Sequence, residues 1–343
     1  MLDMLKMLCA ASGVSGDEGE AREIIRAYAE KYADEITEDT LGNLIVFKRG
    51  IKRSEKKLML CAHMDEVGVI ATAITDDGYV KFAGAGGIDR RVLVGKRVFF
   101  GKNHVPGIIG CAAVHQLSGA ARESVPKVED MYIDIGASSR EAAEQLLEIG
   151  DTGAFDGEAL EYGDGFVRIK AIDDRVGCAV MLKLLEDELP IDTTFVFSVQ
   201  EEIGARGAMT AAFSVEPDIA LVVEGTTAAD LPDVSDGKRV CELGKGAVIP
   251  FMDGGTVSDR ELYKLITTAA EREGIPWQTK KYISGGTDAQ VIQRSRGGVK
   301  TLGIAAPVRN LHSPACVAKM SDIMYVIALA KLFLSEMGLR YGV

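Results

Sequence analysis

The amino-acid sequence predicts an α/β protein with a mixed, mostly parallel sheet sandwiched by helices and an inserted small β-barrel. Two observations lead to this prediction. Towards both ends of the chain, short apolar runs rich in β-branched residues alternate with helix-like segments, which is typical of a parallel sheet covered on both faces. Residues 67–164 instead hold many glycines and short β-type runs. We therefore expect residues 1–66 and 165–343 to form one domain and residues 67–164 a β-rich insert.

The first part of the chain should contain two helices and two strands. Apolar residues fall at helical spacing at the start of residues 1–31, and a second helix follows Ser15–Glu18. Leu41–Lys48 and Lys57–Ala62 are expected strands, and the second of them leads directly to His63.

The insert is expected to be a small barrel or sandwich. Its β-type runs cover residues 67–74, 79–82, 98–100, 107–114 and 131–135. Only Ser139–Leu147 has a helical pattern, with Ser138 or Ser139 as its cap. Many short strands with turn signals between them favour a closed or stacked β structure.

The α/β alternation resumes near Gly165. Expected strands cover residues 166–171, 193–199, 219–223 and 299–305, and expected helices cover residues 178–187 and 322–337. Ser258–Glu261 has the sequence of a capping box, and the apolar residues after it recur at helical spacing. We expect a further helix there.

The composition argues against several classes of protein. The chain has 343 residues, 47% of them hydrophobic, and a formal net charge of -12. That charge disfavours nucleic-acid binding, which requires a basic surface. No apolar run approaches the ~18 residues of a membrane span, and the N-terminus does not resemble a secretory signal. Six cysteines occur without a C-x-x-C pair, so we expect buried free thiols, a cytoplasmic location and no membrane partner.

Phe195–Gly204 is the segment that first suggests chemistry. A strand-like run leads into two adjacent glutamates, Glu201 and Glu202, and Gly204 then begins an Ala-rich helical segment. Functional side chains in open α/β sheets gather just beyond the carboxyl ends of strands. A solvated turn with a capping glutamate explains this segment equally well when it is considered alone.

Five strand-like runs lead to histidine, aspartate or glutamate. In chain order these residues are His63, Asp173, Glu201 with Glu202, Glu224 and His312. The carboxyl ends of parallel strands meet at one edge of a sheet, so six potential metal ligands should converge there. A cap or a turn explains each residue by itself, and the prediction therefore depends on their coincidence.

Imidazole and carboxylate ligands without cysteine suit zinc, cobalt or manganese. Two histidines with three or four carboxylates are too many for one tetrahedral ion and suit two ions that share a bridging carboxylate. Neighbours on an extended chain point in different directions, so one of Glu201 and Glu202 can bind metal while the other acts as general base. This adjacency disfavours a glycosidase, in which two carboxyl groups flank the scissile bond roughly 5–9.5 Å apart.

Asp65 lies two residues after His63, so in an extended segment both side chains point the same way. Its carboxylate can accept the spare imidazole N–H and fix the tautomer that binds metal. A salt bridge or a turn fits the residue equally well.

Six motifs occur in order along the chain. They are H-M-D-E-V-G at His63–Gly68, A-I-D-D-R at Ala171–Arg175, Q-E-E-I-G at Gln200–Gly204, E-G-T-T at Glu224–Thr227, S-G-G-T-D-A at Ser284–Ala289 and L-H-S-P at Leu311–Pro314. Together they resemble the tetrahedral (TET) aminopeptidases, a family of co-catalytic metallopeptidases that includes glutamyl aminopeptidase and proteins once labelled cellulase or endoglucanase. The resemblance covers nearly the whole chain and implies a zinc-peptidase-like catalytic domain with an inserted dimerisation domain.

The resemblance implies two divalent metal ions per subunit, with zinc first and cobalt or manganese as alternatives. One ion would be bound by His63, Asp173 and Glu224, and the other by Asp173, Glu202 and His312. Glu201 would be the general base and Asp65 the partner of His63. A cis peptide between Asp173 and Asp174 is also implied. Many family members have aspartate where this chain has Glu224.

The implied activity is the metal-assisted removal of N-terminal residues from short peptides. In the family the insert usually makes dimer contacts, and six dimers close into a hollow tetrahedral dodecamer, so a homo-oligomer is expected. The turn at Gly285–Asp288 either lines the first specificity pocket or is a plain tight turn. His104 and His115 are expected to be surface or structural residues. For His115 the alternative is a role in a neighbouring subunit's site.

Three other functions remain open at this point. The older family label implies an endo-1,4-β-glucanase-type glycosidase. A related metal-dependent deacylase or carboxypeptidase could share the two-metal core. A non-catalytic binding or scaffold protein is disfavoured, because it has no need to gather so many mutually repelling carboxylates.

Overall fold

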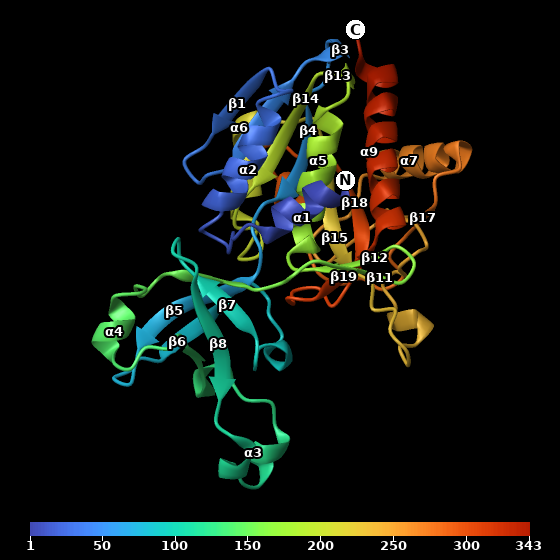
Figure 1. Ribbon diagram of the computed structural model, residues 1–343. Helices are drawn as coiled ribbons and strands as arrows, with labels where there is room; N and C mark the ends of the chain where they lie inside the picture. Colours follow the sequence, from blue (N-terminus) through green and yellow to red (C-terminus); the bar gives the residue numbers. More distant parts are fainter.

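The computed structural model describes residues 1–343 and has two parts (Figure 1). The larger part is a sheet with helices on both faces, and the smaller is a closed barrel attached at one end of it. The predicted fold class, a mixed α/β sheet with an inserted β-barrel, is confirmed.

The large sheet has eleven strands, and the four at its centre run parallel. These four are β14 (Thr193–Ser198), β4 (Leu58–His63), β15 (Ile219–Thr227) and β18 (Lys300–Arg309). One edge of the sheet is formed by β2 (Leu44–Lys48) and β1 (Glu35–Glu38). The other edge is formed by β19 (Cys316–Lys319), β12 (Phe166–Ile169) and β11 (Leu160–Tyr162). Two short strands, β16 (Ala247–Val248) and β17 (Trp277–Gln278), lie beside β18. A separate pair is formed by β3 (Gly50–Lys52) and β13 (Leu189–Ile191). Because β12 and β18 are both antiparallel to β19, β12 points the same way as the central four strands.

Helices cover both faces of this sheet. One face is covered by α1 (Leu2–Ala10), α2 (Gly19–Ala29), α5 (Ile172–Leu185), α7 (Arg260–Glu273) and α9 (Met320–Tyr341), and the other by α6 (Arg206–Val215) and α8 (Ala289–Ile292). In β4, Leu60 and Ala62 enter the main core, whereas Cys61 enters the core under α6 and α8. Burial on both faces explains the uninterrupted apolar run of this strand. No helix has both the length and the apolar composition needed to cross a membrane.

The barrel closes in the order β10-β5-β6-β9-β8-β7. Its strands are β5 (Gly68–Ile74), β6 (Val80–Ala85), β7 (Arg97–Phe100), β8 (Val105–Cys111), β9 (Met131–Asp134) and β10 (Thr152–Phe155). The barrel has its own core of 16 buried residues, so it packs independently of the large sheet. Between β8 and β9, an arm that contains α3 (Ala120–Glu123) extends away from the barrel (Figure 1).

Two local features refine the sequence-based expectations. Strand β11 lies inside the expected insert, but it pairs with β12, so the chain has returned to the large sheet by residue 160. The expected capping box places the cap of α7 at Ser258, whereas Asp259 is the cap, and its Oδ1 accepts hydrogen bonds from the Glu261 and Leu262 backbone N–H groups at 3.0 Å. The Ser258 hydroxyl instead donates to the Pro250 carbonyl at 2.6 Å. In the barrel, Ser139, one of the two expected caps, caps α4 (Arg140–Glu144), which ends before the expected Leu147.

Candidate active site

The five expected metal ligands and the expected general base come together at one edge of the sheet. His63 is the last residue of β4, Glu224 lies within β15, Glu201 and Glu202 follow β14, His312 follows β18, and Asp173 lies at the start of α5, directly after β12. All five strands point to this edge, which explains why residues far apart in the sequence meet there.

Asp173 lies between the two imidazoles. Its Oδ1 is 3.5 Å from Nε2 of His63, and its Oδ2 is 3.5 Å from Nε2 of His312. Nε2 of His63 also lies 3.6 Å from Oε2 of Glu224. Nε2 of His312 lies 3.3 Å from Oε1 of Glu202. The five side chains therefore form two groups of three that share Asp173.

These separations fit metal coordination. A tetrahedral zinc ion holds nitrogen and oxygen ligands at about 2.0–2.2 Å, which places ligand atoms roughly 3.3–3.6 Å from one another. Oδ1 of Asp173 and Oε1 of Glu224 are buried without a hydrogen-bond partner. Buried carboxylate oxygens are normally paired or bound to a cation, so these two atoms call for a ligand.

Asp174 lies close to the same ligands, but its carboxylate oxygens already accept backbone hydrogen bonds. Ligand atoms of His63, Asp174 and Glu224 lie within 4.8 Å of one another, as do those of His63, Asp173 and Glu202. However, the Asp174 carboxylate accepts hydrogen bonds from the His63 backbone N–H at 3.2 Å and from the Gly177 N–H at 2.9 Å. Asp174 thus supports the end of β4, and Asp173 presents the free oxygen. The peptide bond between the two aspartates is cis.

The Nδ1 atom of each histidine faces an oxygen acceptor. Nδ1 of His63 lies 3.1 Å from the carbonyl oxygen of Asp65 and 3.3 Å from its Oδ1. Nδ1 of His312 lies 2.7 Å from the carbonyl oxygen of Gly87, in the loop that follows barrel strand β6. A proton on each Nδ1 leaves Nε2 as a lone pair directed at the carboxylates, the tautomer that binds metal.

Asp65 also holds the turn that carries the two glutamates. Its Oδ1 accepts a hydrogen bond from the Glu201 N–H at 2.9 Å, and its Oδ2 accepts one from the Glu202 N–H at 3.1 Å. The Ser15 hydroxyl donates to the same carboxylate at 2.6 Å. Glu18 accepts a further bond from the Gln200 N–H at 3.2 Å. Three consecutive N–H groups of this turn are therefore bound by two buried carboxylates.

The charges of the site are unbalanced. Burial raises the pKa of Glu201 to about 9, and it also raises the pKa values of Glu202 and Glu224 above their usual range. Against the effect of burial, hydrogen bonds to Asp173 and Glu202 raise the pKa of His312 to about 11. The carboxylates are thus too crowded to ionise together, and bound cations would relieve the repulsion.

Comparison with known proteins places this chain in a family. The sequence pattern of the M42 glutamyl aminopeptidase family matches residues 42–329. The chain belongs to this family. A provisionally named aminopeptidase of Acetivibrio thermocellus is 42% identical over 331 residues, which are 96% of this chain and 97% of the relative. The lysyl aminopeptidase of Pyrococcus furiosus is 33% identical and covers 98% of this chain and 97% of its own.

Solved structures agree with this assignment. A TET aminopeptidase from a marine-sediment Thaumarchaeota archaeon superposes with a TM-score of 0.93 at 32% identity over 99% of this chain and 98% of its own. The TET1 peptidase of Pyrococcus horikoshii, which can assemble into a tetrahedron or a large octahedral shell, gives 0.86 at 32% identity over 96% and 98%. A Thermotoga maritima protein named endoglucanase gives 0.81 at 35% identity over 98% of both chains. As a member of the M42 family, the chain is a peptidase.

Several residues around the M42 site were not predicted from the sequence. Gly87, Asp174 and Glu18 contact the site through single hydrogen bonds. Asp174 belongs to the A-I-D-D-R motif and Glu18 to the acidic pair at Asp17–Glu18, but neither pattern indicated these contacts, and Gly87 gave no signal. Asp288 lies in the expected S-G-G-T-D-A motif, but it is fully buried, and its carboxylate is bound to the Ser198 hydroxyl. Burial raises the pKa of Asp288 to about 6.

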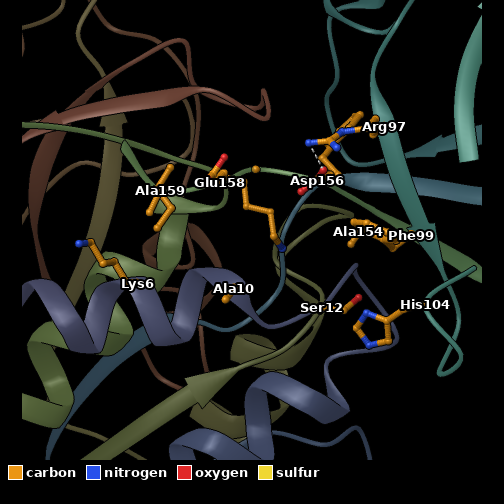
Figure 2. A pocket seen from close by; sticks show the side chains of 14 residues that line it. Lys6, Ala10, Ser12, Arg97, Phe99, His104, Ala154, Asp156, Glu158 and Ala159 are labelled. Carbon is orange, nitrogen blue, oxygen red and sulfur yellow. Dashed lines mark ion pairs between the residues drawn. The ribbon is translucent and has the colours of Figure 1, made fainter. Parts of the chain in front are cut away.

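The other two histidines lie outside the M42 site. His115 is exposed, in a short 3-10 turn after β8. His104 lines a separate pocket of about 430 Å³ between the barrel and the sheet (Figure 2). The lysines and the arginine of that pocket are already paired, as in Arg97 with Asp156 at 2.5 Å, and His104 itself lies 3.7 Å from Glu20. This pocket therefore offers no unpaired lysine or arginine.

Proposed function

We propose that the chain is a metal-dependent aminopeptidase that binds two divalent ions. His63, Asp173 and Glu224 would hold one ion, and Asp173, Glu202 and His312 the other. The observation that carries the proposal is the position of Asp173, whose two oxygens each lie 3.5 Å from a different imidazole. Zinc is the first candidate, and cobalt or manganese suits the same ligand types.

Glu201 is the residue best placed to act as general base. Its Oε2 lies 4.0 Å from Nε2 of His63, so it faces the same space as the ligands. Its own backbone N–H and that of Glu202 both donate to the Asp65 carboxylate, which holds the turn in place. Metal ions bound at the site supply Lewis-acid polarisation of the scissile carbonyl and acidify a bound water. Glu201 would take the proton of the attacking water and pass it to the leaving amine.

A requirement for a free α-amine follows from the surplus of carboxylates. The charged α-amino group of a substrate with a free N-terminus would be attracted to the buried carboxylates. A substrate with a blocked, uncharged N-terminus would lack this attraction. The proposed substrates are therefore short peptides with an unblocked N-terminus. A deacylase or carboxypeptidase with the same metal pair would not share this requirement.

We further propose that the barrel, residues 67–164, is the dimerisation domain and that dimers assemble into a dodecamer. The tetrahedral assembly of the Pyrococcus horikoshii relative supports this proposal. Native mass measurement with and without metal tests the proposal, and a monomer under both conditions contradicts it.

The activity is tested with metal-free protein and metal add-back. We expect hydrolysis of aminoacyl-p-nitroanilides that is lost on chelation and restored by zinc, cobalt or manganese. N-Acetylated aminoacyl-p-nitroanilides should release no p-nitroaniline, and the release of acetate from them would instead indicate a deacylase. Chelator-resistant cleavage of carboxymethylcellulose would overturn the proposal in favour of a glycosidase.

A further inference from the structure

Three charged residues beside the proposed metal site are buried but are not among its proposed ligands. Glu66 is 2% exposed, Lys170 is 5% exposed, and Arg175 is fully buried. Nζ of Lys170 lies 2.6 Å from Oε1 of Glu66, and Nη2 of Arg175 lies 3.7 Å from the same oxygen. A buried ion pair is weak evidence for stability, because desolvation offsets the attraction between its charges. The position of this ion cluster in the chain indicates a role at the site instead.

Each member of the ion cluster is a near neighbour in sequence of a proposed ligand. Glu66 lies three residues after His63, whereas Lys170 and Arg175 lie three residues before and two residues after Asp173. The contact between Lys170 and Glu66 therefore joins the segment that follows His63 to the segment that leads to Asp173. Glu66 and Lys170 also line one small cavity with three members of the site, Asp173, Glu202 and His312.

Arg175 makes a second link between the same two segments. Its Nε donates to the carbonyl oxygen of Met64, the residue directly after the first histidine ligand, at 2.7 Å. Both cations are also fixed to the N-terminal segment, since Nη1 of Arg175 donates to the Leu8 carbonyl at 2.5 Å and Nζ of Lys170 to the Ala11 carbonyl at 3.0 Å. The two ligand-bearing segments are thus held together on both sides of the aspartate that lies between the imidazoles.

We propose that Glu66, Lys170 and Arg175 are positioning residues that hold Asp173 against His63 for metal binding. The inference rests on the proposed two-metal function. Oδ1 of Asp173 lies 3.5 Å from Nε2 of His63, within the roughly 3.3–3.6 Å expected between two ligand atoms of one zinc ion. Coordination distances vary by only about 0.2 Å, so a small shift between the two segments lowers the affinity. Because Asp173 is shared, such a shift weakens the binding of both ions.

The charges of the ion cluster separate a positioning role from a purely electrostatic one. Lys170→Met removes a positive charge close to the carboxylates, so electrostatics alone would strengthen the binding of a cation. Positioning predicts weaker binding. Glu66→Met weakens binding in both cases, but Glu66→Gln keeps an acceptor oxygen for Lys170. Positioning therefore predicts that Glu66→Gln restores the affinity that Glu66→Met loses, whereas electrostatics predicts the same loss for both.

The test is a Co²⁺ titration of the chelator-treated full chain, followed by the visible absorption of the bound ions. We expect Lys170→Met and Glu66→Met each to raise the Kd by about 10- to 100-fold, the range for partners of metal ligands. The absorption spectrum at saturation should also change, because the ligand geometry has changed. Lys6→Met is the matched control and should follow the wild type, since Lys6 lines the pocket on the other side of Lys170 and pairs with Glu161 at 2.6 Å.

The double variant Glu66→Met/Lys170→Met carries the test if a single variant unfolds. Replacing both partners of a buried ion pair by apolar residues is tolerated far better than removing one of them. The double variant also keeps the net charge of the ion cluster. Thermal unfolding checks that it is folded, and we expect it to bind Co²⁺ at least 10-fold more weakly than the wild type, with an altered spectrum.

The outcomes separate the two proposals. If the wild type binds no Co²⁺, the two-metal proposal fails and the inference falls with it. If the wild type binds Co²⁺ and the folded double variant keeps its affinity and spectrum, the ion cluster serves the fold alone and only the inference is overturned. Tighter binding by Lys170→Met, or equal losses in Glu66→Gln and Glu66→Met, would overturn it in favour of an electrostatic role.

Discussion

The Nδ1 atom of His312 lies 2.7 Å from the carbonyl oxygen of Gly87. One residue belongs to the turn after β18 of the large sheet and the other to the loop after β6 of the barrel. The carbonyl fixes both the tautomer and the orientation of an imidazole that faces Asp173 and Glu202. The barrel therefore completes the site of its own subunit, in addition to the assembly role proposed for it.

The two adjacent glycines of this loop should respond differently to alanine. Gly86 has a φ of +86°, and a Cβ there would lie 2.7 Å from Cγ1 of Val67 and 3.2 Å from Cβ of Glu202. Gly86→Ala should cost about 1–3 kcal/mol of stability and weaken metal binding through Glu202. At Gly87 the nearest atom is Nδ1 of His312 at 3.6 Å, an ordinary contact, so Gly87→Ala is the matched control. Thermal unfolding and metal titration check both variants, and equal losses would contradict the proposed contact.

Removing His312 should lower metal content and activity together. It is assigned to the second proposed ion, so His312→Ala should leave that ion bound more weakly by at least 10-fold, the scale of a lost contact to a metal ligand. His104→Ala and His115→Ala remove histidines outside the site and should leave metal content unchanged. Metal analysis after dialysis measures the effect, and full occupancy in His312→Ala would exclude this residue from the site.

Replacing the proposed base should separate catalysis from metal binding. Glu201→Gln keeps the shape of the side chain but removes its ability to accept a proton at the site. We expect kcat to fall by about 10²–10⁴-fold with both ions retained. Glu202→Gln is the contrasting variant, since it should lose metal as well as activity. Loss of metal from Glu201→Gln would mean that the roles of the two glutamates are exchanged.

The sequence was sufficient to predict residues whose position follows from topology. His63, Glu201 and His312 each lie at or shortly after the carboxyl end of a strand of one parallel set. The end of the strand therefore places each side chain at the same edge of the sheet. The order of strands in the sheet was not needed for this, because all their carboxyl ends lie at the same edge.

Contacts made across the fold could not be predicted in this way. Gly87 acts through a backbone carbonyl, which no residue type specifies. Glu18 is a charged residue in a segment that resembles a solvated turn, and only tertiary packing shows it to be buried. Side-chain type and strand order predict where a site lies, whereas the groups that orient it depend on how distant loops pack.

Glu18 provides a pH test of how the turn at Gln200–Glu202 is held. Burial raises the pKa of Glu18 from 4.5 to about 7, and its Oε1 accepts hydrogen bonds from both Gly16 and Gln200. Between these pH values the folded protein keeps a proton that the unfolded chain has lost. The stabilisation is therefore complete below pH 4.5 and is lost as the pH rises to about 7, by up to about 3 kcal/mol.

Glu18→Gln removes this titration but keeps an acceptor oxygen for both N–H groups. The stability of Glu18→Gln relative to the wild type should therefore increase from pH 4.5 to pH 7. Denaturant unfolding of chelator-treated protein measures the difference. Glu23→Gln, which changes a glutamate whose side chain is 68% exposed on α2, serves as the control and should follow the wild type at every pH. Parallel curves for Glu18→Gln and the wild type would show that folding does not raise the pKa of Glu18, since the folded and unfolded chains would then bind its proton equally.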